Sequence, residues 1–353
     1  MTCPDRPHGS VGAMTRTPLA PAPAPEAAAP VTDRLRTALR GVAIVFCLPY
    51  IVLKTAWISG SHVGIPAGSP LLDHRTPMAV ANGASVLMDS AVVVIALLLT
   101  QAWGRRVPAW LLALPMWVAT GLLLPIMTGY PLQLLVRLLG GKTVNKADAG
   151  RPFLDEWVFG VVYTGFIVQG LALGTLFALY ARDRWGHLWQ GTLRELPDSP
   201  TSPALRAAAV AASLLALVPG TLHLLWAAGS TAGLNESRIQ ERTSGSAALE
   251  AVFALFVAAG VAGILLLAFR RNSALPLRVP LVLAWGGSGA TACWGGWMSI
   301  ASLSNVDDLA DRPTAAMVLI YAVQMLVGTL VMTLGAYFLV ERSAANGPAG
   351  RRA

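Results

Sequence analysis

Charge is scarce in this sequence. Only 12% of its 353 residues are charged, whereas 55% are hydrophobic. Soluble domains carry about a quarter charged residues, so this composition excludes an ordinary soluble fold and predicts that lipid surrounds most of the chain. The formal net charge is +8, but most of the arginines lie in short loops between apolar runs, where they set membrane topology. We therefore expect the lipid bilayer as a partner, and no nucleic acid.

Cysteine is also rare, and the familiar catalytic motifs are missing. Cys3, Cys47 and Cys293 form no C-x-x-C pair, which excludes a disulfide framework and a thiol relay. The sequence contains no P-loop, nucleophile elbow, H-E-x-x-H helix or dinucleotide fingerprint. An acidic D-D-x-x-D run at 307–311 has no second acidic motif to face it, so we interpret it as helix capping before Pro313. We expect no cofactor and no metal, and a non-catalytic role more than an enzyme.

Long apolar runs are what the chain has in abundance. Eight of them are long enough to cross about 30 Å of hydrocarbon as helices of about 20 residues. They lack the alternating pattern of barrel strands, so the predicted fold is an all-α polytopic membrane protein with eight transmembrane helices. The predicted spans are 38–59, 79–101, 107–128, 154–181, 204–228, 246–269, 279–302 and 314–340.

Arginine is distributed unevenly between the two sides of these spans. The even-numbered connections and the segments flanking the first and last spans hold most of the arginines, while the odd-numbered loops hold most of the acids. Because cytoplasmic loops are enriched in Lys and Arg, we expect a cell-membrane protein with both termini in the cytoplasm. Residues 1–33 are polar and then Pro/Ala-rich without an apolar core, which predicts a disordered cytoplasmic tail rather than a signal peptide.

The two halves of the chain share landmarks in the same order, which indicates an internal duplication. Predicted units are a first four-span repeat at 34–181, a cytoplasmic linker at 182–203, a second repeat at 204–340 and a tail at 341–353. Since each half has an even number of spans, the repeats would have the same orientation, with a cavity expected at their interface. The landmarks expected at the outer face are Trp57 with Trp226, Arg75 with Arg242, Asn145 with Asn305, and Asp148 with Asp308.

One segment of the second half has a recognisable pattern. The run Gly220-Thr221-Leu222-His223-Leu224-Leu225-Trp226-Ala227-Ala228-Gly229-Ser230 resembles the first helix of an uncharacterised family of four-span actinobacterial membrane proteins, which ends in a His-Leu-x-Trp-Ala-x-Gly type motif. The resemblance implies a four-span unit and no particular chemistry. The first half departs from the motif, because Lys54 stands where the second half has His223.

Four ionisable residues fall within predicted spans, where an uncompensated charge is costly. Lys54 and His223 each lie three residues before a repeated tryptophan, and Asp89 and Glu250 lie in the spans that follow. We predict that Lys54 pairs with Asp89 and that His223 pairs with Glu250. The alternative is that Lys54 extends to the outer interface and that Glu250 is favoured by the start of a helix.

Three classes of function remain open. The repeat and the intramembrane ionisable pairs favour transport or binding of a small molecule at an outward-facing site between the repeats. The alternatives are a structural or partner-binding membrane protein without such a site, and a membrane-embedded enzyme that uses the carboxylates. The glycine-rich run at 285–297 predicts close helix packing, with a break that lines a substrate path as the alternative. The oligomeric state has no signature in the sequence.

Overall fold

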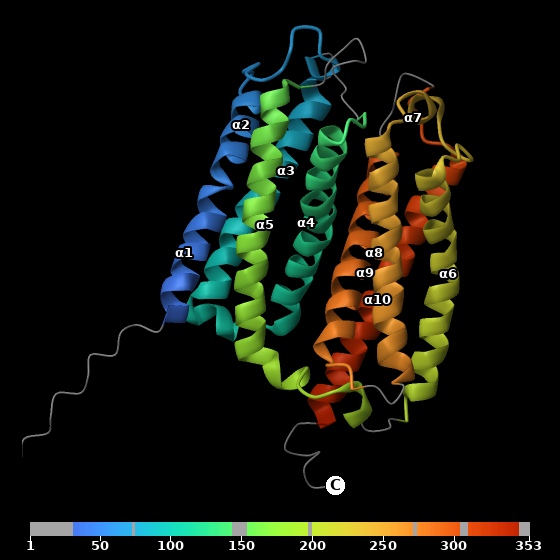
Figure 1. Ribbon diagram of the computed structural model, residues 1–353. Helices are drawn as coiled ribbons and strands as arrows, with labels where there is room; N and C mark the ends of the chain where they lie inside the picture. The colour runs from blue at the N-terminus through green and yellow to red at the C-terminus, as the bar shows by residue number, and fades with distance from the viewer. Residues whose placement is uncertain are drawn as a thin grey trace, which may run out of the picture.

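Long apolar α-helices build the whole described part of the chain, as the composition predicts. The computed structural model describes residues 31–72, 75–142, 154–196, 200–270, 274–303 and 310–345, and its helices run side by side as a bundle (Figure 1). The long helices are α1 (Val31–Val45), α2 (Leu48–Ile58), α3 (Arg75–Thr100), α4 (Ala109–Leu138), α5 (Glu156–Trp185), α6 (Ser202–Ala228), α8 (Ser244–Phe269), α9 (Arg278–Ala301) and α10 (Ala315–Ala345).

Within the described residues, seven helical segments are long and apolar enough to cross a membrane, so the protein is a multi-pass membrane protein. They are Asp33–Ile58, which joins α1 and α2, and the segments of α3, α4, α5, α6, α8 and α10. Helix α9 is of similar length but is not one of them, because glycine, serine and tryptophan take the place of aliphatic residues along it. Seven of the eight predicted spans therefore coincide with one of these segments, and the remaining one, on α9, does not.

The first span is broken near its middle. Helix α1 ends at Val45 and α2 begins at Leu48, with a tight turn at Phe46 and Cys47 between them. Proline at position 49 has no backbone N–H to donate to the preceding turn, so the chain must relax there. The thiol of Cys47 donates to the carbonyl oxygen of Ala43 at 3.1 Å, and Gln169 donates to its sulfur at 3.1 Å.

Two groups of helices lie side by side in Figure 1. Helices α1, α2, α3 and α5 form one group, and α6, α8, α9 and α10 form the other, with α4 between them. Helix α4 packs against α5 on one side and against α8 and α9 on the other. The N-terminal end of α1 and the C-terminal end of α10 lie at the same end of the bundle, since Arg36 pairs with Asp183 while Arg342 donates to Gln190 in the segment that follows.

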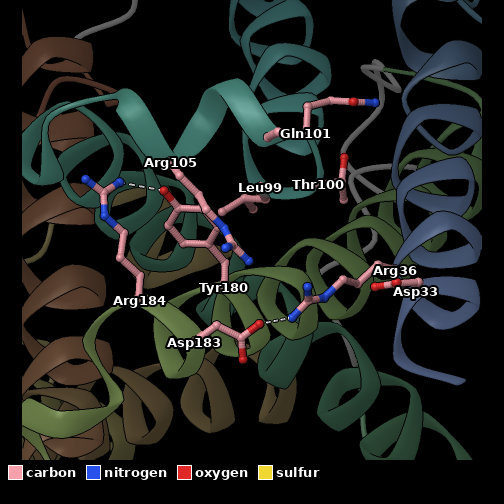
Figure 2. Close-up of a pocket in the computed structure, with 10 residues that line it drawn as sticks. Asp33, Arg36, Leu99, Thr100, Gln101, Arg105, Tyr180, Asp183 and Arg184 are labelled. Atoms are coloured by element: carbon pink, nitrogen blue, oxygen red, sulfur yellow. Dashed lines mark hydrogen bonds and ion pairs between the residues drawn. The ribbon is translucent and has the colours of Figure 1, made fainter. Parts of the chain in front are cut away.

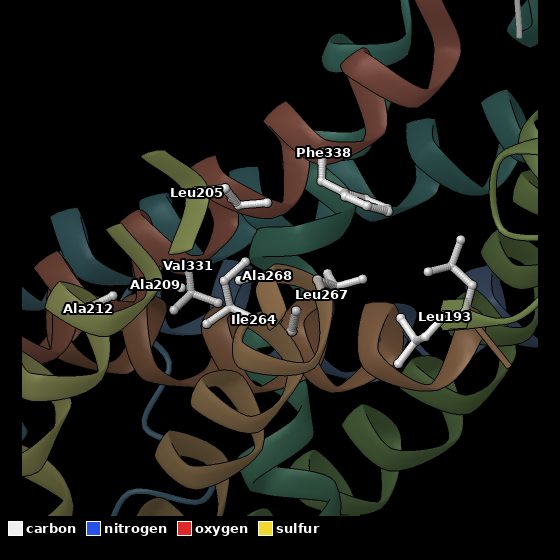
Figure 3. Packing of buried hydrophobic residues seen from close by; sticks show 11 residues of the cluster. Leu193, Leu205, Ala209, Ala212, Ile264, Leu267, Ala268, Val331 and Phe338 are labelled. Atoms are coloured by element: carbon white, nitrogen blue, oxygen red, sulfur yellow. The ribbon is translucent and has the colours of Figure 1, made fainter. Parts of the chain in front are cut away.

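Each group has its own apolar core. In the second group, side chains of α6, α8, α9 and α10 converge around the fully buried Ile264 and Leu267 (Figure 3). In the first group, Leu112 and Leu173 belong to a separate cluster that joins α1, α3, α4 and α5. Both clusters bury aliphatic side chains between helices, whereas many outward-facing leucines stay exposed for lipid.

Helix α9 is the most closely packed helix of the bundle, and glycine makes this contact possible. A Cβ atom added to Gly287 would lie 2.2 Å from the backbone nitrogen of Gly260 in α8, and one added to Gly121 in α4 would lie 2.3 Å from the carbonyl oxygen of Gly289. Such close backbone approaches need small residues. Because α9 is continuous from Arg278 to Ala301, the packing interpretation of the glycine-rich run is confirmed and the broken helix is wrong.

Candidate functional site

The predicted pair of His223 and Glu250 is formed. His223 lies on α6 and is 5% exposed, and its Nδ1 is 2.5 Å from Oε2 of Glu250 on α8. Because an ionised carboxylate only accepts hydrogen bonds, we assign the proton of this bond to Nδ1 of the ring. A carboxylate in this position fixes both the tautomer and the orientation of an imidazole.

The second ring nitrogen of His223 faces α10. Its Nε2 is 2.6 Å from Nε2 of the buried Gln324. With the amide in this orientation, Gln324 donates to a neutral imidazole; a second proton on the ring would require the amide to rotate and present its oxygen. Three helices, α6, α8 and α10, thus hold this one imidazole between a carboxyl group and an amide.

Arg238 connects this buried pair to the surface. Its guanidinium lies 3.4 Å from Oε1 of Glu250, and its side chain is 41% exposed. It lies on the short helix α7 (Glu236–Gln240), which Asn235 caps by accepting a hydrogen bond from the backbone N–H of Arg238. The side chain of Glu250 is therefore reached from outside the bundle, whereas His223 lies behind it.

The predicted ion pair between Lys54 and Asp89 is not formed. Lys54 donates to Oδ1 of Asn82 at 2.9 Å, while Asp89 is hydrogen-bonded to Gln169, and no ion pair within the described residues joins Lys54 to Asp89. Asn82 lies two turns before Asp89 on the same face of α3, closer to the end of the bundle that Lys54 occupies. The two charges still interact through space.

Lys54 also lies against aromatic rings. Its Nζ is 5.0 Å from the ring centre of Tyr50 and 4.8 Å from that of Trp57, at the distances of cation–π contacts. Lys54 therefore has partners inside the bundle, and the interpretation that it extends to the interface is wrong. His223 has matching neighbours, because its ring centre is 5.4 Å from that of Trp226 and 5.5 Å from that of Phe253.

The two landmark tryptophans close loops of the same shape. Trp57 Nε1 donates to the carbonyl of Val63 at 2.7 Å, and Trp226 Nε1 donates to the carbonyl of Ala232 at 2.9 Å, each six residues further along. In both loops a serine hydroxyl accepts a backbone N–H from two residues later. The glycines that end these loops have φ angles of 74° at position 64 and 76° at position 233, a left-handed conformation that favours glycine.

A groove opens between the two groups of helices, at the end of the bundle opposite the N-terminus of α1. Its volume is about 410 Å³. Lys142, just after α4, lines one side, and residues from the end of α6 and the start of α8 line the other. The second-group residues are Ala227, Ala228, Gly229, Arg242, Thr243, Ser244 and Ala247.

The floor of this groove lies one helical turn above the buried pair. Ala227 follows His223 by four residues on α6, and Ala247 precedes Glu250 by three residues on α8, so each alanine shares a helix face with one member of the pair. One turn corresponds to about 5.4 Å along the helix axis. Ala227 and Ala247 of the groove lining are thus the residues that lie one turn from His223 and Glu250 on their helices.

Arg242 both lines the groove and holds its shape. Its guanidinium donates to the carbonyl oxygens of Trp226, Gly229 and Ser230 at the end of α6. The carbonyl of Trp226 also accepts the backbone N–H of Gly229, and a cation is favoured beside the carbonyl groups at the C-terminal end of a helix. Thr243 then begins α8 with a capping box in which Ser246 is the reciprocal partner.

Several predicted landmarks lie outside the described residues. Asn145, Asp148, Asn305 and Asp308 belong to this group, as do two acids of the D-D-x-x-D run; the side chain of Arg75 is not described either. Within the described ranges, no group of three or more His, Cys, Asp or Glu side chains could hold a metal ion.

Sequence reasoning missed two members of the site. Asn82 and Arg238 carried no signal of their own, because an amide in an apolar helix and an arginine in a polar loop are both common. Gln169 and Gln324 do stand out in the sequence, since polar groups within spans four and eight are rare and either line a path or bond across helices; the structure shows both in contacts between helices. No protein-family model, curated protein or solved structure matches this chain.

Proposed function

We propose that this protein binds and transports a small polar molecule, which enters from the outer face through the groove between Lys142 and Arg242. The observation that carries the proposal is the chain of contacts from Arg238 through Glu250 and His223 to Gln324, one helical turn beneath that groove. Ionisable groups held together within a membrane bundle are a hallmark of proton and substrate pathways.

The lining of the groove favours an anion. Its charged members are Lys142 and Arg242, its hydroxyl groups come from Thr243 and Ser244, and none of its lining residues is acidic. The start of α8 adds the positive end of a helix dipole at the same place. A small organic acid or a comparable anion fits this chemistry.

His223 supplies the coupling step in the proposal. In this proposal a proton on Nε2 makes the ring a cation, and Gln324 turns its amide oxygen toward the ring to accept the new hydrogen bond. The positive charge would then lie beneath the anion in the groove. Uptake of one proton with one anion is the expected stoichiometry.

The proposal includes a topology of eight spans made from two copies of a four-span unit. The matched loops at Trp57 and Trp226, and the matched contacts of Lys54 with Asn82 and of His223 with Glu250, support a duplication. In this topology α9 is the seventh span and both termini are cytoplasmic. Kinship of the unit with the actinobacterial four-span proteins is part of the same proposal.

A structural or partner-binding role is the second candidate. It is favoured by the close contact of α4 with α9, where Trp117 donates to Ser288 at 3.0 Å and Gly121 lies against Gly289. Such packing leaves no room for solvent between the helices there. An experiment that measures proton movement separates the two candidates.

The test is solute-driven proton flux in liposomes that contain the full-length protein and an internal pH-sensitive dye. Monocarboxylates, dicarboxylates and inorganic phosphate are added outside in turn. We expect one of these classes to acidify the interior, and we expect Glu250→Gln to abolish the acidification, because the neutral amide no longer orients and charges His223.

Glu241→Gln is the matched control, since this exposed glutamate is not among the residues that line the groove and is not one of the partners of His223 or Glu250. It removes the same charge and should transport as the unaltered protein does. If none of the solutes drives proton flux, the transport proposal is overturned in favour of the structural role. The same holds if a folded Glu250→Gln protein gives a flux equal to that of the unaltered protein.

A further inference from the structure

A second cavity lies at the opposite end of the first helix group, far from the groove. It has a volume of about 350 Å³ and is bordered by α1, α3 and α5 together with the short 3₁₀ helix η2 (Ala102–Arg106) (Figure 2). Its charged lining residues are Asp33, Arg36, Arg105, Asp183 and Arg184. The groove and His223–Glu250 play no part in it.

Hydrogen bonds between elements give this cavity a fixed frame. Tyr180 on α5 donates to the carbonyl of Gly104 in η2 at 2.9 Å, and Arg184 donates to the carbonyl of Val107 at 2.8 Å. Arg36 on α1 pairs with Asp183 on α5. Both η2 and α1 are thus tied to the last two turns of α5, which gives the lining side chains fixed supports.

The cations of the cavity exceed what its acids neutralise. Asp183 accepts from both Arg36 and Arg182, so its charge is already compensated. Arg184 donates only to the neutral Tyr180 hydroxyl and the Val107 carbonyl. Among the described residues, Arg105 forms no hydrogen bond or ion pair, and Figure 2 shows its side chain extending beside the ring of Tyr180 into the cavity.

We propose that this cavity binds a phosphate group, carried by an anionic phospholipid whose headgroup lies against Arg105 and Arg184. Guanidinium groups bind phosphate oxygens with charge-assisted hydrogen bonds. The volume falls within the range of small-molecule sites, which is enough for a phosphodiester and its polar substituent.

The surroundings of the cavity suit a lipid more than a free ion. The cavity opens at the end of apolar helices, where headgroups lie, and the helices that border it carry exposed apolar side chains for acyl chains to contact, such as Leu35 of α1 and Val94 of α3, which are 45% and 51% exposed. Under the proposed topology this is the cytoplasmic side, whose leaflet is rich in anionic lipid; basic pockets between helices bind headgroups there.

The chain provides a matched pair of variants. Arg105 and Arg106 are neighbours in η2 and both are exposed, but only Arg105 lines the cavity. Arg105→Gln and Arg106→Gln therefore remove the same charge at the same membrane surface. A nonspecific attraction to anionic lipid would weaken equally in both variants, whereas a site in the cavity depends on Arg105 alone.

Native mass spectrometry of the delipidated full-length protein, titrated with phosphatidylglycerol or phosphatidylcholine, measures the binding. We expect preference for phosphatidylglycerol, and Arg105→Gln should weaken its binding about tenfold, which corresponds to ~1.4 kcal/mol. Arg106→Gln should leave that affinity within about twofold, or ~0.4 kcal/mol. Unchanged thermal unfolding verifies that the Arg105→Gln protein is folded.

Inorganic phosphate and glycerol phosphate, added as competitors, identify the source of the phosphate group. If these competitors displace phosphatidylglycerol only weakly, the ligand is a lipid whose acyl chains contribute to binding. If they displace it at low concentration, the same phosphate site takes a soluble ligand. Equal loss in Arg105→Gln and Arg106→Gln, or equal binding of phosphatidylcholine, overturns the proposal. The liposome assay of proton flux does not depend on this outcome.

Discussion

A buried indole N–H needs an acceptor, and Trp57 and Trp226 satisfy this need in the same way. Each ring closes its own loop through a single hydrogen bond to a backbone carbonyl. Replacing either tryptophan with phenylalanine keeps most of the apolar ring but leaves that carbonyl without its donor. We expect each variant to lose about 1 kcal/mol of unfolding free energy, measured as denaturant-induced unfolding in detergent.

Trp103→Phe is the control for both variants, because this tryptophan in η2 is 48% exposed and no hydrogen bond to its indole is recorded within the described ranges. Its unfolding free energy should be unchanged within a few tenths of a kcal/mol, as for most surface substitutions. If Trp57→Phe is destabilising and Trp226→Phe is not, the equivalence of the two loops is wrong.

The ionisable residues show how accurately the depth of a side chain within the helix bundle can be predicted from sequence. Glu250 lies within the first two turns of α8, which starts at Ser244, so its partner on the neighbouring helix was found correctly. The span on α3 begins at Met78, close to the predicted start at residue 79. Asp89 nevertheless lies two turns deeper than Asn82 on this helix, and Asn82 is the residue that accepts the hydrogen bond from Lys54.

At the scale of helices, the crossing of α4 and α9 depends on glycine. A Cβ atom at position 121 would lie 2.3 Å from the carbonyl oxygen of Gly289, so Gly121→Ala must push the two helices apart. We expect a loss of about 1–3 kcal/mol in unfolding free energy, the usual cost of overpacking a core. The measurement is unfolding of the purified protein in detergent or in bicelles.

Gly174→Ala is a matched substitution on α5, where an added Cβ atom meets nothing within 4 Å. Alanine favours a helix over glycine by about 1 kcal/mol, so this variant should be as stable as the unaltered protein or more so. Equal behaviour of Gly121→Ala and Gly174→Ala would mean that α4 and α9 do not approach as closely as described.

The sequence patterns predict where these helices lie along the chain, but not which helices they pack against. The helix ends fall within a few residues of the predicted spans for α5, α6, α8 and α9, because apolar runs and flanking arginines mark them clearly. Helix α4 extends to Leu138, ten residues past its predicted end, since Pro131 lies inside the helix rather than after it. The glycines of α9 predicted close packing, but three different helices use them, which no periodicity could specify.

For the whole molecule, the path of α9 decides the topology. Helix α8 ends at Phe269 and α9 begins at Arg278, close to the segment after α5, because the backbone N–H of Leu277 donates to the carbonyl of Gly191. If α9 crosses the membrane, its two ends must lie on opposite sides. Then the chain has eight spans, and α6 to α10 repeat the orientation of α1 to α5.

Site-directed labelling tests this path in the full-length protein with its native cysteines replaced. Ala274→Cys and Leu303→Cys place single thiols beyond the two ends of α9, at positions that are exposed. A membrane-impermeant maleimide should label residue 303 in intact cells and residue 274 only in inside-out vesicles. Because α9 lies between α8, α10 and α4, its low hydropathy does not prevent it from crossing, since protein rather than lipid surrounds it. Labelling of both positions from the same side would leave seven spans, place the termini on opposite sides of the membrane and end the proposal of a parallel duplication.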